Sequence, residues 1–573
     1  MTLVAGIDVG NATTEVVIAD CRTVPPTPLA WDRAPTRGRK GSARALEAGV
    51  ELLRRAERRV GLTADLIALA PQHPVDTLSA TVPSPPIDTG RLAVLASGRP
   101  TPSGRGVGVG RPVAVELAPD AAAGPVVLVA TDPLGYSATA ARVNSWLSAG
   151  AEVVGVLLAG DEAVLVSGRL RAPLPVLDQV DTGAALAALL VAVEVAEPGR
   201  PLRELGDPVR LAAMLGLASV EHPHAEAAAR AVRGSRDAAI AVLAAPLDLP
   251  VEGEAATVIA ADGSTLDLLA HLARLREGGA TDVVRCRLPR SDGSLGDHEV
   301  ADLWGVDLTA LGERAVARPG AVNDRSVALA LLAPPPRTGE SQAGAMAALE
   351  VLDRRFVWAG TEAEAALAGA LTTPGAQRSA VVVDIGAGTI DVVGPSGVGT
   401  VLAGAGELLT ASVAELLGIS RGQAEWVKRG PCERVEAPHV VVDESGLRRF
   451  TDEAASTGSV GWLVAPGPAG PLPFEQRLAP SEWRTLRLTL KQELVGGNIR
   501  RAVGTGVGAS DVIVVGGPAG DDEVLDCVAR ALPGAIPGRG NVAGTLGHRW
   551  AVAYGLVVLA SSGLTDAAGS THD

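Results

Sequence analysis

The chain has 573 residues, a formal net charge of −15, 47% hydrophobic residues and only 2% aromatic residues. This length and apolar content suffice for several domains with separate cores. Because duplex binding depends largely on lysine and arginine, and single-strand binding on stacked aromatic rings, the composition predicts no nucleic-acid partner.

Targeting and redox features predict a soluble, cytoplasmic protein. The four cysteines lie far apart, which argues against a disulfide framework and against a Cys-x-x-Cys metal site. The longest apolar run, residues 184–193, is too short to span a bilayer and ends at Glu194. No basic segment with a cleavage site precedes the first apolar strand, so we expect neither a secretory signal nor a membrane segment.

The first residues predict a β-hairpin around a glycine-rich turn. An apolar strand, residues 3–7, ends at Asp8; Gly10, Asn11 and Thr13 follow, and a second β-branched strand returns. Glycine lets backbone N–H groups approach a phosphate closely, a hydroxyl adds a donor, and an Asp at a strand end can face a metal ion. This hairpin is therefore a candidate phosphate and metal site.

After the hairpin, the pattern continues as alternating helix and strand. Residues 43–60 have the period of an amphipathic helix, and residues 66–69 form a short apolar strand. Together these elements predict the first part of an α/β domain over residues 1–92. The following Gly/Pro/Ser/Thr-rich stretch, residues 97–110, predicts a loop at the domain boundary.

An inserted α/β domain is predicted over residues 93–240. It contains strands at residues 126–130 and 153–158, a helix at residues 138–149 and a further short strand at residues 163–166. The alternation of strands and helices indicates a small unit with its own core.

The hairpin pattern returns far downstream. An apolar strand, residues 381–383, ends at Asp384; Gly386, Gly388 and Thr389 follow, and another β-branched strand returns. Two such hairpins facing each other would clamp a nucleotide polyphosphate.

The second hairpin belongs to the predicted continuation of the first domain, residues 241–432, in which residues 362–371 form a helix. Residues 433–480 are rich in turns, Gly and Pro, and predict a small insert. The last part of the domain is predicted over residues 481–560, and residues 561–573 predict a flexible tail.

The last part contains a further candidate ligand turn. A helix at residues 481–503 and a strand at residues 512–515 lead into Gly516, Gly517 and Pro518, and a final helix is predicted at residues 549–559. A double-glycine turn after a strand can place the backbone against a ligand.

Basic residues are nearly all arginine, and Lys40, Lys428 and Lys491 are the only lysines. Where composition so favours arginine, a lysine suggests a site that requires a compact ammonium group rather than a planar guanidinium. We apply this interpretation to Lys428.

The two hairpins and the later double-glycine turn, in this order, resemble the phosphate-one, phosphate-two and adenosine segments of the actin-like ATPase superfamily. This superfamily includes actin, sugar kinases and heat-shock chaperones. The resemblance implies an α/β fold, with a core of duplicated ribonuclease H-like subdomains and ATP or ADP bound between them.

Further segments resemble the large subunit of the diol and glycerol dehydratase reactivating factors, over nearly the whole chain. They are residues 155–161 and 170–178 of the inserted domain, and residues 369–375, 402–406 and 538–541. This resemblance implies an inserted swivelling domain and ATP-dependent chaperone activity. The protein would release damaged cobalamin from an inactivated adenosylcobalamin-dependent dehydratase, so that intact coenzyme can bind.

Carried over position by position, the resemblance implies that Asp8 and Asp384 hold the magnesium ion of the nucleotide, directly or through water. The residues implied to contact ATP or ADP are Asn11, Ala12, Thr13, Gly386, Gly388, Thr389, Glu425, Trp426, Val427, Lys428, Gly516, Gly517, Pro518 and Arg549. Two of them depart from the family pattern. Ala12 replaces a usual hydroxyl residue, and Pro518 has no N–H to donate.

The same family has a structural metal in the inserted domain, at positions that match Thr101, Asp161 and Asp178. Two carboxylates and a hydroxyl suit a hard cation such as magnesium or calcium, with further oxygen ligands from water or a partner chain. On the residues alone, the alternative is that all three belong to turns that follow strands.

Glu362 and Glu364 precede the second hairpin, where related ATPases place the residue that orients the attacking water. Only one positioned acceptor is needed, and the sequence leaves the choice between the two open. The alternative for either residue is a solvated helix face.

The resemblance also implies partners: a small reactivase subunit, in a hetero-oligomer of two large and two small subunits, and the dehydratase itself. Two rival functions remain open on the residues alone, a small-molecule kinase and a filament-forming ATPase. A kinase would need an acceptor pocket that no sequence feature identifies. Dehydratase activators with an iron–sulfur cluster are disfavoured because the cysteines are scattered.

Overall fold

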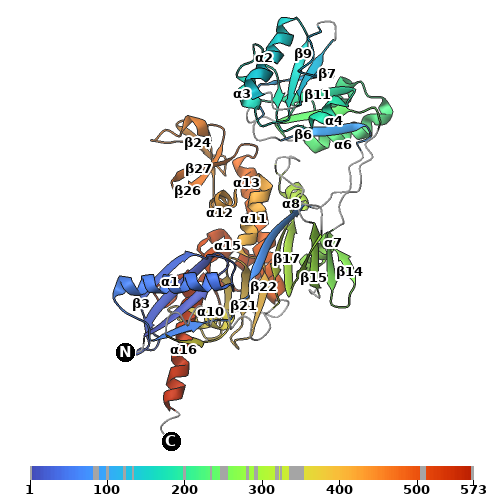
Figure 1. Ribbon diagram of the computed structural model, residues 1–573. Coiled ribbons are helices and arrows are strands. Elements are labelled where there is room, and N and C mark those ends of the chain that lie inside the picture. Colours follow the sequence, from blue (N-terminus) through green and yellow to red (C-terminus); the bar gives the residue numbers. More distant parts are fainter. Residues whose placement is uncertain are drawn as a thin grey trace.

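Figure 1 shows the computed structural model of the chain. The residues that it describes are 3–81, 89–98, 102–120, 124–131, 135–197, 202–232, 235–245, 256–278, 283–289, 295–316, 322, 326–334, 354–503 and 511–569. Within these ranges, no helix is long and apolar enough to cross a membrane.

The first hairpin forms the centre of a five-stranded sheet with the order β19-β4-β1-β2-β3. Its strands are β1 (Leu3–Val9), β2 (Thr13–Asp20), β3 (Thr27–Pro35), β4 (Leu66–Leu69) and β19 (Arg355–Trp358). The first three are antiparallel neighbours, and β4 is parallel to both β1 and β19. Helix α1 (Ala43–Val60) packs on this sheet; it begins after the Ser42 cap and ends at Gly61, whose left-handed φ of 67° favours glycine.

The second hairpin forms the centre of another five-stranded sheet, with the order β22-β21-β20-β28-β29. Its strands are β20 (Val381–Ile385), β21 (Thr389–Val393), β22 (Gly399–Ala403), β28 (Asp511–Val515) and β29 (Ile536–Arg539). Three antiparallel strands again meet two parallel ones in the same order. The hairpin pattern that occurs twice in the sequence therefore corresponds to a structural duplication.

Two helices cross in the core that contains residues of both sheets, α10 (Glu362–Ala370) and α16 (Ala551–Gly569). A Cβ atom on Gly369 would lie 2.0 Å from the carbonyl oxygen of Ala551, and one on Gly555 would lie 1.8 Å from that of Ala365. Only glycine permits this close approach. The predicted final helix, residues 549–559, is too short, because α16 continues through the alanine-containing segment that follows to Gly569.

Residues 92–242 form a separate seven-stranded sheet with the order β10-β9-β8-β7-β11-β12-β6, which lies apart from the other sheets in Figure 1. Its strands are β6 (Leu92–Ser97), β7 (Gly106–Ala114), β8 (Val126–Ala130), β9 (Val153–Leu158), β10 (Val176–Leu177), β11 (Leu190–Val195) and β12 (Asp237–Val242). The accompanying helices are α2 (Gly135–Ser148), α3 (Ala163–Ser167), α4 (Thr182–Leu186), α5 (Pro208–Leu215) and α6 (His222–Val232).

Two local predictions in this unit are wrong. The glycine-rich stretch expected to be a loop up to residue 110 enters the central strand β7, because its glycines permit close packing: a Cβ on Gly108 would lie 2.5 Å from Val154. The expected strand at residues 163–166 is the short helix α3. An apolar run of this length does not distinguish the two by periodicity.

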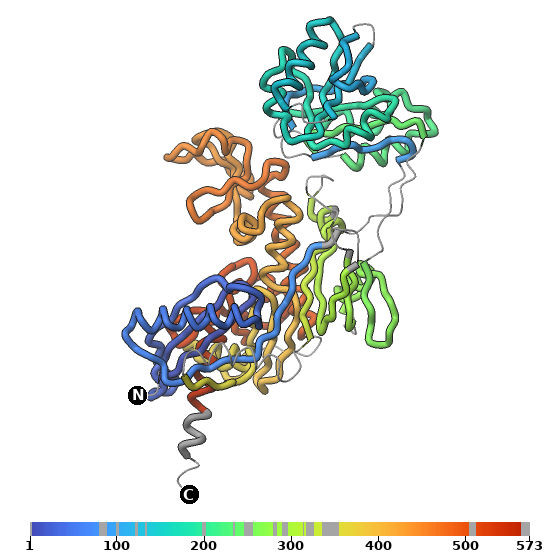
Figure 2. The backbone as a smooth tube through the Cα atoms, viewed as in Figure 1, coloured from blue at the N-terminus to red at the C-terminus, as the bar shows by residue number. Residues whose placement is uncertain are grey.

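Two further sheets contain strands that precede or follow this unit in the chain. A three-stranded sheet has the order β17-β18-β5, with β5 (Val75–Thr81), β17 (Asp302–Asp307) and β18 (Ser326–Leu332). Strand β5 is the long blue segment beside β18 in Figure 2. A four-stranded sheet contains β13 (Thr257–Ala260), β14 (Thr265–Asp267), β15 (Val283–Pro289) and β16 (Leu295–Glu299), with helices α7 (Leu268–Arg276) and α8 (Leu308–Ala315) nearby in the sequence.

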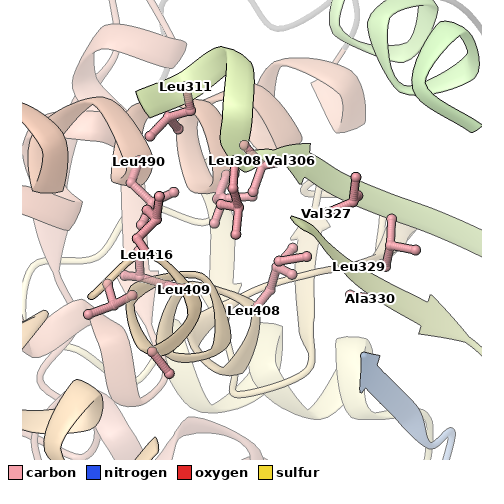
Figure 3. Close-up of a cluster of buried hydrophobic side chains, with 14 of the residues drawn as sticks. Val306, Leu308, Leu311, Val327, Leu329, Ala330, Leu408, Leu409, Leu416 and Leu490 are labelled. Carbon is pink, nitrogen blue, oxygen red and sulfur yellow. The ribbon is translucent and has the colours of Figure 1, made fainter. Parts of the chain in front are cut away.

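Figure 3 shows how a shared core joins the three-stranded sheet to the second hairpin domain. Val306 and Leu329 from the sheet and Leu308 from α8 lie in one cluster with Leu408 of α11 (Gly406–Leu417) and Leu490 of α13 (Pro480–Lys491). The sheet is thus packed rigidly against the helices that follow the second hairpin.

The predicted small insert contains a five-stranded antiparallel sheet with the order β25-β24-β23-β26-β27. These strands are β23 (Glu433–Ala437), β24 (Val440–Asp443), β25 (Arg448–Phe450), β26 (Leu463–Gly467) and β27 (Gly470–Glu475), and α12 (Arg421–Val427) packs against β26. The predicted helix at residues 481–503 is interrupted by a π-helical turn, Gln492–Gly496, between α13 and α14 (Gly497–Val503).

Candidate functional site

The two duplicated hairpins bring acidic side chains together around one lysine. Asp8 at the end of β1 and Asp384 near the end of β20 are joined by Asp391 of β21 and by Glu362, the first residue of α10. The Nζ atom of Lys40 lies 2.7 Å from Oε2 of Glu362, and the lysine side chain is 6% exposed. The sheets therefore converge on a buried, strongly acidic site.

Removal from water and mutual repulsion raise the pKa values of the three aspartates in this site. Burial, then the nearby Glu362 carboxylate, raises the pKa of Asp8 to about 8. Burial, then Asp391, raises the pKa of Asp384 to about 8, and burial, then Glu362, raises that of Asp391 to about 7. Although burial acts in the opposite direction, Glu362 and Asp8 hold the pKa of Lys40 above its ordinary value, so this lysine stays charged.

The turns of the two hairpins touch each other. Asn11 donates from Nδ2 to the carbonyl oxygen of Val75 at 2.6 Å. A Cβ atom on Gly388 would lie only 2.7 Å from the same Nδ2 atom, so this contact requires glycine. Ala12 is exposed, whereas Thr13, Gly386 and Thr389 are partly buried in the same turns.

The double-glycine turn lies against the second hairpin. Gly516 has a φ of 89°, and a Cβ atom there would lie 2.4 Å from Oδ1 of Asp384. Pro518 packs on the turn that starts α11, since a Cβ on Gly406 would lie 3.1 Å from its ring. Pro518 has no N–H to donate, and its ring instead packs on the neighbouring turn.

The predicted adenosine helix α12 meets the same turn through Lys428, which follows its last residue. The Nζ atom of Lys428 donates to the Gly406 carbonyl at 2.8 Å and to Oε2 of Glu425 at 2.6 Å. Trp426 is 36% exposed, and Arg429 stacks on its ring at 4.7 Å, whereas Val427 is fully buried in the core. Lys428 therefore contacts the turn that starts α11, with Glu425 as its ion-pair partner, while the Val427 side chain is buried.

Arg549 lies between the first hairpin and the double-glycine turn. Its Nη1 atom lies 3.7 Å from Oε1 of Glu15 in β2, and a Cβ atom on Gly517 would lie 2.8 Å from that nitrogen. Burial, then the charge of Asp8, raises the pKa of Glu15 to about 8. Arg549 therefore links the first hairpin to the double-glycine turn.

The structure separates the two glutamates that the sequence left as alternatives. Glu362 faces Lys40 and the aspartates. Glu364 is exposed, and its Oε2 accepts from the backbone N–H of Thr361 at 2.8 Å in a capping box at the start of α10. Glu362 alone of the pair belongs to the acidic site.

The acidic site fits a hydrated divalent cation. The buried Oδ1 of Asp391 has no hydrogen-bond partner within the described ranges, and water or an ion supplies such a partner. In the same ranges no three His, Cys, Asp or Glu side chains form a ready set of ligands, so a cation here would require water to complete its coordination. A cavity of about 290 Å³ adjoins the site; it is lined by Asn11, Arg39, Lys40, Val75, Asp76, Thr77, Leu78, His298 and Glu407.

The residues predicted to hold a metal in the inserted domain are only partly described. Thr101 lies outside the described residues. Asp178 is fully buried, with Oδ2 3.4 Å from the N–H of Ala163, and Asp161 is exposed just before the same helix, α3. Gln179 donates its backbone N–H to the carbonyl of Gly160 at 3.2 Å, which holds the two turns side by side.

Sequence reasoning missed Lys40, Glu15 and Asp391. The sequence signal that could have identified Lys40 is the rarity of lysine in this chain. In the structure all three lysines, Lys40, Lys428 and Lys491, are buried and form ion pairs. Glu15 and Asp391 occupy positions in β2 and β21 that face the site, just after the two turns. Such positions are visible once both hairpins are aligned by strand alternation.

Comparison with known proteins agrees with this geometry. Residues 279–560 match the family model of the diol dehydratase reactivase ATPase-like domain, and residues 94–247 match that of the swiveling domain of the same reactivating factor. The chain is 31% identical to the large subunit of the propanediol dehydratase-reactivating factor of Citrobacter freundii, over 97% of this chain and 98% of the relative. The chain belongs to the large subunits of the dehydratase-reactivating factors.

Solved structures of the family share the fold. A diol dehydratase-reactivating factor in nucleotide-free form has a TM-score of 0.59 and 26% identity, over 98% of this chain and all of that chain. A glycerol dehydratase reactivase has a TM-score of 0.58 and 25% identity, with the same coverage. The predicted family and the predicted α/β ATPase fold with an inserted swivelling domain are confirmed.

The raised pKa values predict an unusual dependence of stability on pH. Between the ordinary carboxyl pKa and about 8, the folded protein without nucleotide or magnesium binds more protons than the unfolded chain, so its free energy of unfolding should fall as pH rises. Asp384→Asn removes one contributing group and should stabilise this form at pH 8 by about 1–3 kcal/mol, with less gain at pH 5.

Urea unfolding at the two pH values measures both effects. Asp526→Asn is the matched control, because this Asp side chain is 71% exposed and lies outside the site. Wild-type stability that rises from pH 5 to pH 8, or equal stability of wild type and Asp384→Asn at pH 8, would contradict the electrostatic description.

Proposed function

We propose that this protein is an ATP-dependent chaperone that reactivates an adenosylcobalamin-dependent diol or glycerol dehydratase. The observation that carries the proposal is the contact between the two duplicated hairpins, Asn11 against Gly388, beside buried carboxyl groups, in a chain of the reactivating-factor family. The protein would loosen the inactivated dehydratase, so that damaged cobalamin leaves and intact coenzyme enters.

ATP would bind with its phosphates between the hairpins. The backbone N–H groups of both turns would contact the phosphates, with the hydroxyls of Thr13 and Thr389 as added donors. The walls of the adenosine site would be α12 with Glu425 and Lys428, and the turn of Gly516, Gly517 and Pro518. Arg549 lies beside this turn, where it contacts Glu15, and would lie near the base.

Magnesium would be held through water by Asp8 and Asp384, with Asp391 beside them. This arrangement would keep the buried carboxyl groups ionised and offset the negative charge of the phosphates. When bound, the ion supplies electrostatic stabilisation of the charge that develops on the transferred phosphoryl group.

Glu362 would orient the attacking water, and Lys40 would hold the carboxylate of Glu362 in place. Their 2.7 Å ion pair fixes the direction of the Glu362 side chain. The charge of Lys40 would also attract the terminal phosphate of ATP.

The partners would be the small subunit implied by the large-subunit relatives and the dehydratase itself. A hetero-oligomer of two large and two small subunits is the arrangement that we propose. In the inserted domain, Asp161 and Asp178, with Thr101, would hold a magnesium or calcium ion near that partner.

Reactivation tests the proposed function. A diol or glycerol dehydratase is inactivated during turnover and then mixed with this protein, its small subunit, ATP, magnesium and fresh adenosylcobalamin. Wild-type protein should restore activity only with ATP, and Asp384→Ala should reduce the ATP-dependent rate by about 100-fold or more, since it removes a carboxylate at the magnesium. Asp526→Asn should behave like wild type. Absence of recovery with wild-type protein would contradict the proposal, and phosphorylation of glycerol or a sugar would point to a kinase.

The two glutamates of α10 form a matched pair for the catalytic assignment. Glu362→Gln should lower kcat for ATP hydrolysis by about 100-fold, because the amide is a poor acceptor for the proton of the attacking water. Glu364→Gln changes only the helix cap and should keep kcat within about threefold of wild type. Steady-state phosphate release measures both, and equal effects of the two substitutions would contradict the assignment of Glu362.

A further inference from the structure

The loop between β22 and α11 lies directly against the second phosphate hairpin. The N–H of Gly404 donates to the carbonyl of Gly388 at 2.8 Å, and the N–H of Gly406 donates to that of Gly386 at 3.2 Å. Both glycines of the hairpin turn are therefore fixed by this loop. A shift of the loop would shift the turn with it.

Asn498 holds the loop from the opposite side. Its side chain is fully buried at the start of α14, and Nδ2 donates to the carbonyl of Ala403 at 2.7 Å and to that of Gly404 at 2.9 Å. Loss of these donors would leave two buried carbonyl groups without them. The π-helical turn just before α14 sets the rotation of Asn498 about the helix, and such turns are frequent at functional sites.

The same loop is tied to the three-stranded sheet by Asp302, the first residue of β17. Its Oδ2 accepts from the N–H of Ala403 at 2.7 Å and from Nη2 of Arg501 at 2.6 Å, and the Asp302 side chain is buried. Asp302 therefore connects β17 to both the loop and α14. Strand β5, which belongs to the same sheet, precedes the inserted domain in the chain.

Trp304 fills the space between the loop and the π-helical turn. Its Nε1 donates to the carbonyl of Leu494 within that turn at 3.1 Å. Its ring separates two glycines: a Cβ atom on Gly404 or Gly497 would lie 2.9 Å or 3.1 Å from ring carbons. Since Trp304 is also in β17, a second residue of this strand fixes the position of the loop.

We propose that Asn498 is a positioning residue for the second phosphate hairpin, and that Asp302 and Trp304 couple this hairpin to the three-stranded sheet whose strand β5 precedes the inserted domain. The inference rests on the proposed nucleotide function. ATP and ADP differ by the phosphate between the hairpins, and a ligand shifts a conformation only by binding two states unequally. The loop touches the hairpin through the N–H groups of Gly404 and Gly406, and it touches the sheet through Asp302.

Asn498→Leu tests the proposal, because leucine fills a similar volume without the two donors. We expect kcat for ATP hydrolysis to fall by about tenfold or more, whereas the Kd for ADP should change by less than about threefold, since the adenosine walls are untouched. Hydrogen exchange gives the second readout. Replacing ADP by a non-hydrolysable ATP analogue should alter protection of β5 in the wild type but not in the variant.

Trp304→Phe is the second variant, because it keeps an aromatic ring and removes the indole N–H; it should also lose the nucleotide-dependent change in β5. Trp483→Phe is its matched control: Trp483 is equally buried, and its Nε1 has no hydrogen-bond partner among the residues described. Ser412→Ala, which removes one buried hydroxyl within α11, is the control for Asn498.

The outcomes separate this inference from the proposed function. Wild-type protein that neither binds nor hydrolyses ATP overturns both. Active wild type with an Asn498→Leu variant of unchanged kcat and unchanged exchange in β5 overturns the inference alone. If thermal unfolding shows that Asn498→Leu does not fold, hydrogen exchange of β5 in Trp304→Phe decides between the outcomes. A nucleotide-dependent change in β5 equal to that of wild type and of Trp483→Phe overturns the inference.

Discussion

The rest of the site depends on five buried or half-buried carboxyl groups gathered around two basic side chains. Asp8, Asp384, Asp391, Glu362 and Glu15 face Lys40 and Arg549, and full ionisation would leave excess negative charge in a region shielded from water. The protein alone meets this constraint by protonation, which is why the pKa values of Asp8, Asp384 and Glu15 are raised to about 8. A magnesium–nucleotide complex would meet it by supplying positive charge.

The duplicated architecture explains how one chain assembles this cluster. Each sheet contributes an antiparallel hairpin with an aspartate at the end of its first strand, and the crossing of α10 and α16 keeps the two sheets close. Close approach at Gly369 and Gly555 removes the freedom of the halves to separate at that point.

The sequence predicted features formed by neighbouring residues and missed contacts between residues that are far apart in the chain. Asp8 and Asp384 were found because a strand, a glycine turn and a returning strand are contiguous. Lys40 was not assigned, because its partner Glu362 lies 322 residues away and only the folded chain joins them. The sequence also predicts a loop where β7 begins, because strands with several glycines resemble turns in sequence. Only the folded chain shows that Glu362 pairs with Lys40 while Glu364 caps the start of α10.

Proton release on nucleotide binding tests whether the ligand converts the protonated carboxyl groups of the site to their ionised form. If the carboxyl groups are protonated without ligand and ionised with it, binding of preformed magnesium–ATP at pH 7.5 should release about one proton or more per chain. Isothermal titration calorimetry in buffers of different ionisation enthalpy measures this number. We expect release in the wild type and less release in Asp384→Asn. Binding with no proton release, or with proton uptake, would contradict it.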